Sequence, residues 1–154
     1  MYILLNDDKQ LIITEHTSIY QNENLIDQIF FYIPSIYKEH DLSDFDITLQ
    51  YVTPANEVIN EKLVKNGLYK DKLEYVLPVD TKISKCAGVV KCSLKIKKET
   101  IEKDKKIIYK MNTSEININI LPSTNYNDFI DKDENGSGGN NEGCSCDGNI
   151  VVEF

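Results

Sequence analysis

"DLSDFDITLQYVTP", residues 41–54, predicts a single β-strand with a turn at each end. Apolar and polar side chains alternate through its centre, as they do in a strand with one buried and one exposed face. Phe45, Ile47, Leu49 and Tyr51 are expected to point inward, and Asp46, Thr48 and Gln50 outward. Asp and Ser supply turn chemistry at the start, and Pro54 ends the strand because it has no backbone N–H to donate. The stretch is therefore predicted to be scaffold, since nothing in it indicates catalysis.

Stretches of the same kind recur along much of the chain. Alternation is clearest in "VVKCSLKIK" (89–97) and "SEININI" (114–120), whereas helical periodicity is limited to possible turns within 57–67 and 125–130. Many short strands separated by Pro, Gly and Asn are typical of an antiparallel sandwich or barrel, so the predicted class is all-β. The further strands are expected within 1–14 (a hairpin) and at 27–33, 57–64, 72–77, 88–98 and 112–120.

The composition changes after the last of these strands. We expect one compact domain at 1–122, an acidic linker rich in Gly and Asn at 123–143, and an apolar arm at 144–154 that contains two cysteines. The arm is either packed against its own domain or added as a strand to a neighbouring subunit, and the linker allows both. The residues predicted to bind a partner are Ile150, Val151, Val152 and Phe154.

The charge composition limits the classes of partner. All 17 basic residues are Lys, and the formal net charge is −8, which argues against a nucleic-acid partner because Arg and a basic surface usually serve that recognition. No apolar run reaches the roughly 20 residues that a bilayer span needs, so no membrane partner is expected. Residues 82–110 nevertheless hold ten Lys and three acidic residues. This segment is predicted to be a solvated hairpin that protects a sheet edge, or a basic edge that docks on an acidic partner or neighbouring copy.

The four cysteines do not have the spacing of a zinc site. Cys92 falls on the inward face of its predicted strand and is expected to be a buried thiol. Cys144 and Cys146 could crosslink copies in an assembly. No metal ligand and no cofactor is predicted from the cysteines.

One segment of the linker matches the pattern of an EF-hand calcium loop. Its matching residues are Asp131, Asp133, Asn135, Gly136 and Glu142. Gly138 occupies the position where such loops usually carry a packing hydrophobe, and no helix is predicted after the loop. A plain linker is therefore the favoured interpretation of this segment.

No catalytic residues are predicted. His16 and His40, the only histidines, lie in polar, turn-like stretches without a nucleophile in a matching pattern. Asp41, Asp44 and Asp46 could form a carboxylate cluster, but turn capping and solvent exposure account for them. We therefore expect a protein that is not an enzyme.

The order of the strand motifs resembles a known family. "DLSDFDITLQYVTPANEVI" (41–59), "YKDKLEYVLPVDTKISKCAGVVKCSLKI" (69–96) and "TSEININI" (113–120) resemble the small immunoglobulin-like virion domains of tailed phages of Gram-positive hosts. The motif order is similar to that of the N-terminal domain of the baseplate upper protein family. The shared features are the turn at Asp41 to Ser43, the strand end at Pro54, Tyr75 with Leu77 and Pro78, Gly88, and the alternation from Ile116 to Ile120.

This resemblance implies an antiparallel immunoglobulin-like β-sandwich with a flexible C-terminal arm. It implies a virion structural protein, made in the host cytoplasm, that acts by binding other virion proteins and forms homo-oligomers within the particle. The leading hypothesis is an adaptor or accessory domain of the tail or baseplate. The alternatives are a capsid decoration protein bound to the major capsid subunits, and a calcium- or glycan-binding module that contacts the host surface.

Overall fold

Strand β7 (Asp46–Val52) occupies the centre of the 41–54 stretch. Its inward side chains are buried, and Leu49 is fully enclosed. Leu49 lies opposite Leu94 of the neighbouring strand β11 (Gly88–Glu102), so alternation in both strands places apolar side chains on the same face. The expected strand and the expected division of its side chains into a buried and an outer face are therefore confirmed.

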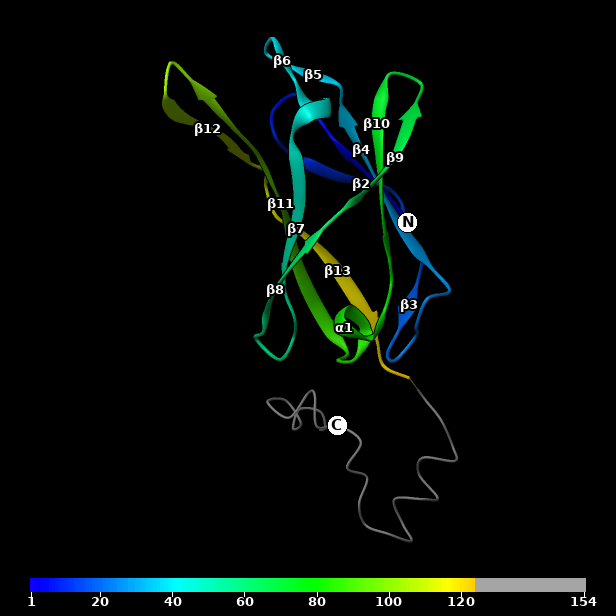
Figure 1. Cartoon of the computed structure of the whole chain (residues 1–154). Helices are drawn as coiled ribbons and strands as arrows, with labels where there is room; N and C mark the ends of the chain where they lie inside the picture. The colour runs from blue at the N-terminus through cyan, green and yellow to red at the C-terminus, as the bar shows by residue number, and fades with distance from the viewer. Residues whose placement is uncertain (124–154) are drawn as a thin grey trace, which may run out of the picture.

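The computed structural model describes residues 1–123, which form two packed β-sheets (Figure 1). Sheet A has the order β2-β1-β4-β10-β9, and sheet B has the order β3-β13-β11-β7-β8 with β12 paired to β11. The strands of sheet A are β2 (Leu11–Glu15), β1 (Tyr2–Leu5), β4 (Gln28–Pro34), β10 (Lys72–Pro78) and β9 (Val64–Tyr69). The other strands of sheet B are β3 (Ile19–Tyr20), β13 (Ile116–Leu121), β8 (Val58–Lys62) and β12 (Lys105–Asn112).

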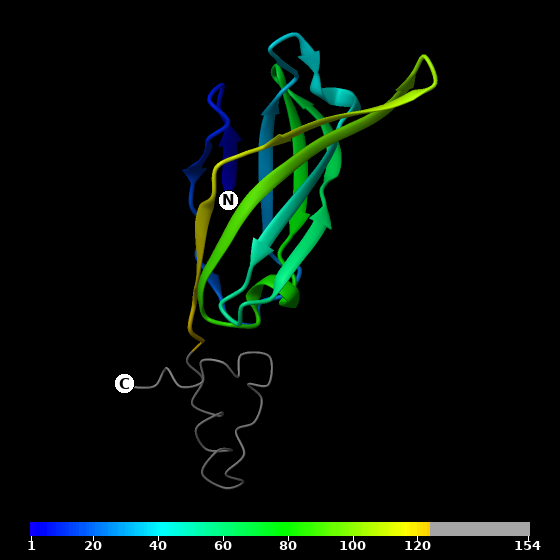
Figure 2. The same ribbon diagram turned by 90° about the vertical axis from the view of Figure 1, so that its left-hand side faces the viewer.

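The core lies between the inward faces of the two sheets (Figure 2). Sheet A contributes Ile3, Phe31 and Tyr75, and sheet B contributes Leu49 and Leu94, all at most 3% exposed. Most neighbouring strands are antiparallel, but β1 pairs with β4 and β13 pairs with β3 in parallel. The immunoglobulin-like β-sandwich expected from the sequence is confirmed, with these two parallel pairs as the difference.

Short elements close the ends of the sandwich. Strands β5 (Ile36–Tyr37) and β6 (His40–Asp41) form a small hairpin that leads into the 3-10 turn η1 (Leu42–Asp44). The short helix α1 (Thr81–Ser84) connects sheet A to sheet B, with the Asp80 carboxylate accepting from the Lys82 N–H as its cap.

The helical turn predicted within 57–67 is wrong. This segment forms β8 and β9, and Leu63 between them is buried where the chain passes from sheet B to sheet A. The strand prediction for 57–64 therefore holds only in part, because it merges the end of one strand with the start of another. The possible turn at 125–130 lies outside the described residues.

Gly88 begins β11 in a conformation that side chains rarely adopt. Its φ is +132°, and a Cβ built there would lie 3.1 Å from Pro54 Cβ and Cγ. Two of the features that carried the family resemblance, Pro54 and Gly88, are thus in contact across the end of sheet B. The glycine is explained by both its backbone angle and this close approach.

Candidate interaction surfaces

The outer face of sheet A carries a cluster of aromatic rings, which we call the aromatic face. Tyr2 lies 5.5 Å from Phe30 and 5.9 Å from Tyr32, measured between ring centroids, and Tyr32 lies 5.5 Å from Tyr69. Edge-to-face and tilted contacts of this kind are favourable between aromatic rings. The rings come from β1, β4 and β9, so three strands separated in sequence build one surface.

The pairing of the strands explains why these rings meet. Tyr2 lies opposite Phe30 in the parallel pairing of β1 and β4, and Leu4 lies opposite Tyr32. Strand β2 continues the surface, because Ile12 lies opposite Leu4 and is 43% exposed. The aromatic face is therefore continuous across sheet A.

Strand β4 is apolar on both of its faces. Ile29, Phe31 and Ile33 enter the core, while Phe30 and Tyr32 point to the outer face and are only half-buried. A strand that is covered by other elements on both sides has such a sequence, whereas a strand with one solvated face alternates. Within the described residues, other elements pack only against the inner face of β4.

The outer face of sheet B has a different chemistry. Its central positions alternate with the core residues of β7, β11 and β13 and are mostly Lys, Thr, Gln and Asn. They include Thr48, Gln50, Lys91, Lys95, Asn117 and Asn119. The two outer faces of the same domain thus differ, and the aromatic face is the one typical of an interaction site.

A fixed carboxylate lies at the margin of the aromatic face. Tyr32 Oη donates to Glu74 Oε2 at 2.8 Å, and Asn66 Nδ2 donates to Glu74 Oε1 at 2.9 Å. Burial raises the pKa of the Tyr32 phenol well above its usual range, and the adjacent Glu74 raises it further. The rings and Glu74 line a groove of about 630 Å³ together with Thr14 and residues 70–72.

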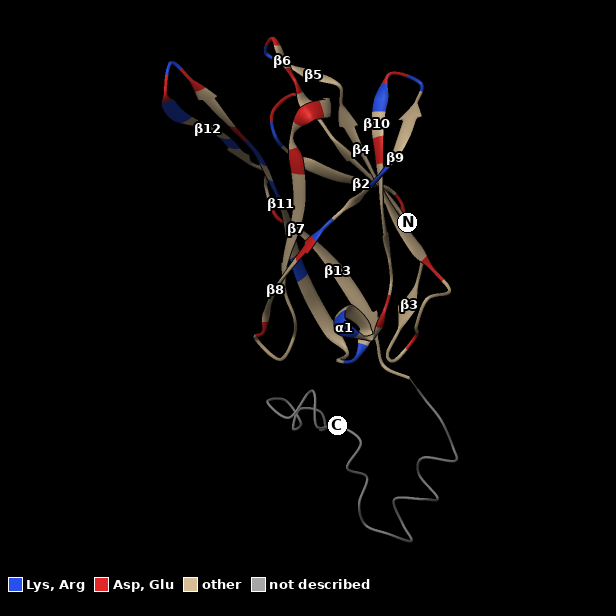
Figure 3. Cartoon of the chain, viewed as in Figure 1, with Lys and Arg blue, Asp and Glu red and all other residues tan. Residues whose placement is uncertain are grey.

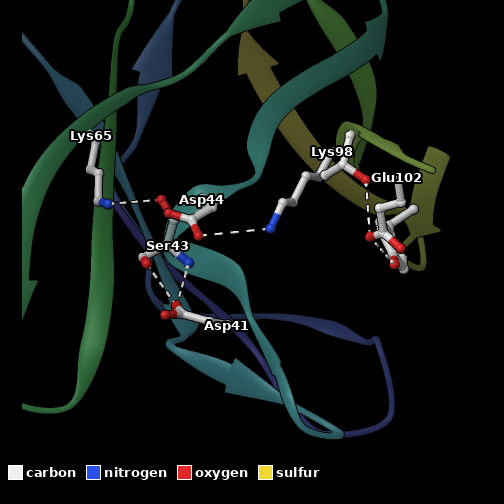
Figure 4. Close-up of polar contacts among 8 residues, drawn as sticks. Asp41, Ser43, Asp44, Lys65, Lys98 and Glu102 are labelled. Atoms are coloured by element: carbon white, nitrogen blue, oxygen red, sulfur yellow. Dashed lines mark hydrogen bonds and ion pairs between the residues drawn. The ribbon is translucent and has the colours of Figure 1, made fainter. Parts of the chain in front are cut away.

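Strand β9 forms an exposed edge of sheet A. All six of its residues are exposed, and Val64 and Leu68 are 62% and 67% exposed. Lys65 extends toward the η1 turn, where its Nζ donates to the Ser43 carbonyl at 3.1 Å, so Lys65 binds the domain itself (Figure 4). The edge therefore presents aliphatic side chains.

The β11–β12 hairpin extends beyond the sandwich, as Figure 2 shows. Tyr109 anchors its base, with its ring 6.5 Å from Phe45 and 5.7 Å from His40. Ile101 and Ile108 are 79% and 50% exposed near the tip. Figure 3 shows charged residues of both signs on the hairpin. Lys97 and Lys106 both contact Glu99, so part of the positive charge is compensated locally.

The aspartates considered as a carboxylate cluster serve separate structural roles. Asp41 Oδ1 accepts from the Ser43 N–H and hydroxyl, and these hydrogen bonds lower the pKa of the Asp41 carboxyl (Figure 4). Asp44 contacts Lys98 at 3.8 Å, and Asp46 contacts Lys62 at 3.0 Å. The expected turn capping by Asp41 is confirmed. His16 is exposed in the segment between β2 and β3.

The predicted partner-binding residues Ile150, Val151, Val152 and Phe154 lie outside the described residues. The same holds for Cys144, Cys146 and the Asp131 to Glu142 loop. Within residues 1–123, no group of three or more His, Cys, Asp or Glu side chains could hold a metal ion. No helix in that range is long and apolar enough to cross a membrane.

Cys92 is a buried free thiol, as expected, and Cys86 is disulfide-bonded. Burial raises the pKa of the Cys92 thiol to about 12, and the negative charge of Glu115 contributes. Because the pKa of the Cys92 thiol is higher in the folded than in the unfolded protein, the neutral thiol stabilises the fold at pH values below the unfolded-state pKa. This stabilisation is lost as the pH rises toward about 12.

We expect Cys92 to resist iodoacetamide in the folded protein at mildly alkaline pH and to react completely in urea. Peptide mapping by mass spectrometry measures the modification. Rapid labelling of Cys92 under native conditions would contradict its enclosure between the sheets.

No protein-family model matches the chain, and no curated protein matches it. Among solved structures, the chain is similar to the N-terminal domain of phage TP901-1 ORF48. The match covers 80% of this chain and 97% of that domain, with 12% identity and a TM-score of 0.47.

Proposed function

We propose that this chain is a non-enzymatic structural protein of a phage virion, an adaptor or accessory domain of the tail or baseplate. It acts by contacts with other virion proteins. The motif order from 41 to 120 supports the virion assignment through its resemblance to phage immunoglobulin-like domains. The aromatic face is the observation that carries the binding role.

An uncovered aromatic sheet face is favourable in an assembly because a partner removes it from water. Interfaces between proteins are enriched in Tyr and Phe, which supply large contact areas. Tyr2 and Ile12 are 39% and 43% exposed, so a partner can bury apolar surface that the fold leaves in solvent. The polar outer face of sheet B then remains in contact with water.

The C-terminal arm at 144–154 is the second proposed contact. Its apolar residues Ile150, Val151, Val152 and Phe154 engage an adjacent subunit, and the segment from 124 to 143 provides the connection. A surface on the domain and a strand at the chain end would allow one copy to contact two neighbours. This arrangement is what an adaptor requires.

We expect Ile12→Lys to reduce incorporation of the protein into particles at least tenfold, because it places a charge within the aromatic face. Val89→Lys is the matched control. Val89 is 42% exposed on the outer face of sheet B, so the two substitutions introduce the same side chain at equally exposed strand positions. Quantitative immunoblotting of purified particles measures incorporation. Equal incorporation of the two variants would contradict a binding role for the aromatic face.

A further inference from the structure

The edge of β9 lacks the features that usually protect a sheet edge from pairing. Protected edges carry free Lys side chains, Pro, or very short strands. In β9, the Lys65 ammonium binds the Ser43 carbonyl, and the Asn66 amide binds Glu74. The polar side chains are thus held by the domain, while Val64 and Leu68 are left in solvent.

Two other sheet edges, β8 and β3, differ from the β9 edge. Strand β8 carries charge along its edge, with Lys62 bound to Asp46 at 3.0 Å and Glu61 bound to Lys82 at 3.1 Å. Strand β3 has only two residues. Strand β9 differs from both in combining six exposed residues with two aliphatic side chains that face solvent.

A bulge divides the edge into two parts. The register of β9 with β10 shifts at Asn66 and Gly67, and Gly67 has a φ of +94°. A bulge bends the strand but leaves the backbone hydrogen-bonding groups on either side of it in place. A short added strand can therefore pair beside Val64 or beside Leu68 and Tyr69.

The chain itself contains a short segment with matching properties. Residues 150–154, "IVVEF", place Ile150, Val152 and Phe154 on one side of a strand and are rich in β-branched residues. They follow the described domain by 26 residues rich in Gly and Asn.

We propose that the β9 edge receives residues 150–154 of a second copy as an added strand. Main-chain hydrogen bonds supply the pairing, and the aliphatic side chains of the arm contact Val64 on one side of the bulge or Leu68 on the other. Strand β13 ends at the end of the sandwich opposite the turn between β9 and β10 (Figure 1). Copies joined in this way contact one another through different surfaces, so the association is head to tail. The inference rests on the proposed function, in which the arm engages a neighbouring subunit.

Complementation between two variants tests this pairing. The edge variant is Val64→Lys with Leu68→Lys, and the arm variant is Ile150→Lys with Val152→Lys, both in the full chain. Sedimentation velocity should show concentration-dependent association of the wild-type chain and monomers for each variant alone. An equimolar mixture should form a dimer that does not grow, because only one edge and one arm are intact in each pair. Val58→Lys with Val89→Lys places the same charges on sheet B, at positions 59% and 42% exposed, and should associate like the wild type.

A monomeric wild-type chain at all concentrations, or a mixture that remains monomeric, would overturn the proposal. A monomeric wild type is also the result expected if the arm binds the β9 edge of its own copy. Circular dichroism of both variants confirms that the sandwich is retained. Self-association and location in the particle are independent readouts, so a chain that associates as described but is absent from virions would contradict only the proposed function.

Discussion

Leu49→Ala is expected to lower the free energy of unfolding by about 2–5 kcal/mol. Leu49 is fully buried at the centre of β7 and lies opposite Leu94, which is also fully buried. Truncation removes apolar contacts and leaves a cavity between two packed sheets that can close only partly. Because small domains have a total stability of about 5–15 kcal/mol, this change removes a large share of it.

Urea unfolding followed by tyrosine fluorescence measures this loss. Gln50→Ala is the control, since Gln50 is the next residue of the same strand and its side chain lies on the outer face. Its effect should remain within about 1 kcal/mol, the range of surface substitutions and single exposed hydrogen bonds. Equal losses in the free energy of unfolding for Leu49→Ala and Gln50→Ala would contradict the assignment of Leu49 to the buried face and Gln50 to the outer face of β7.

Gly88→Ala is expected to lower the free energy of unfolding by about 1–3 kcal/mol. Two causes combine, because the φ of +132° strains any side chain and the new Cβ would lie 3.1 Å from Pro54. Gly67→Ala tests the effect of a positive φ without the effect of a close contact. Gly67 also has a positive φ, of +94°, but nothing lies within 4 Å of a Cβ built there.

We therefore expect Gly88→Ala to cost more than Gly67→Ala in the same urea assay. Replacing Pro54 by Ala in the Gly88→Ala background should recover part of the difference, which a double-mutant cycle quantifies. If Gly67→Ala is the more damaging substitution, the close approach of Pro54 to Gly88 does not restrict that position.

Alternation in the sequence predicted strands that have one buried face and one solvated face. In β7 and β13, alternation reports directly on one buried and one solvated face. Strand β7 was found close to its expected ends, whereas β13 begins at Ile116 and the predicted start at 112 is the last residue of β12. Strand β9 was predicted only at its first residue, within 57–64, and β12 only as part of a possible hairpin within 82–110. All of β9 is exposed and contains Asn66 and Gly67, which resemble a turn, while β12 lies in a Lys-rich segment that extends past the core.

The aromatic face was not predicted, although Tyr2, Phe30 and Tyr32 lie in predicted strands. The run "IFFYI" in β4 reads as a core strand, and alternation cannot distinguish a second buried face from an apolar face left in solvent. Only the pairing of β1 with β4 brings Tyr2 beside Phe30 and Tyr32. The role of residues 150–154 remains a prediction, since these residues lie outside the described range.

Immunogold electron microscopy of intact particles tests the virion assignment most directly. An antibody against the polar outer face of sheet B is suitable, because the proposal leaves that face in solvent. The proposed function predicts gold at the tail tip. Gold over the head would replace the adaptor by the capsid decoration alternative, and particles without label would contradict the assignment to the virion.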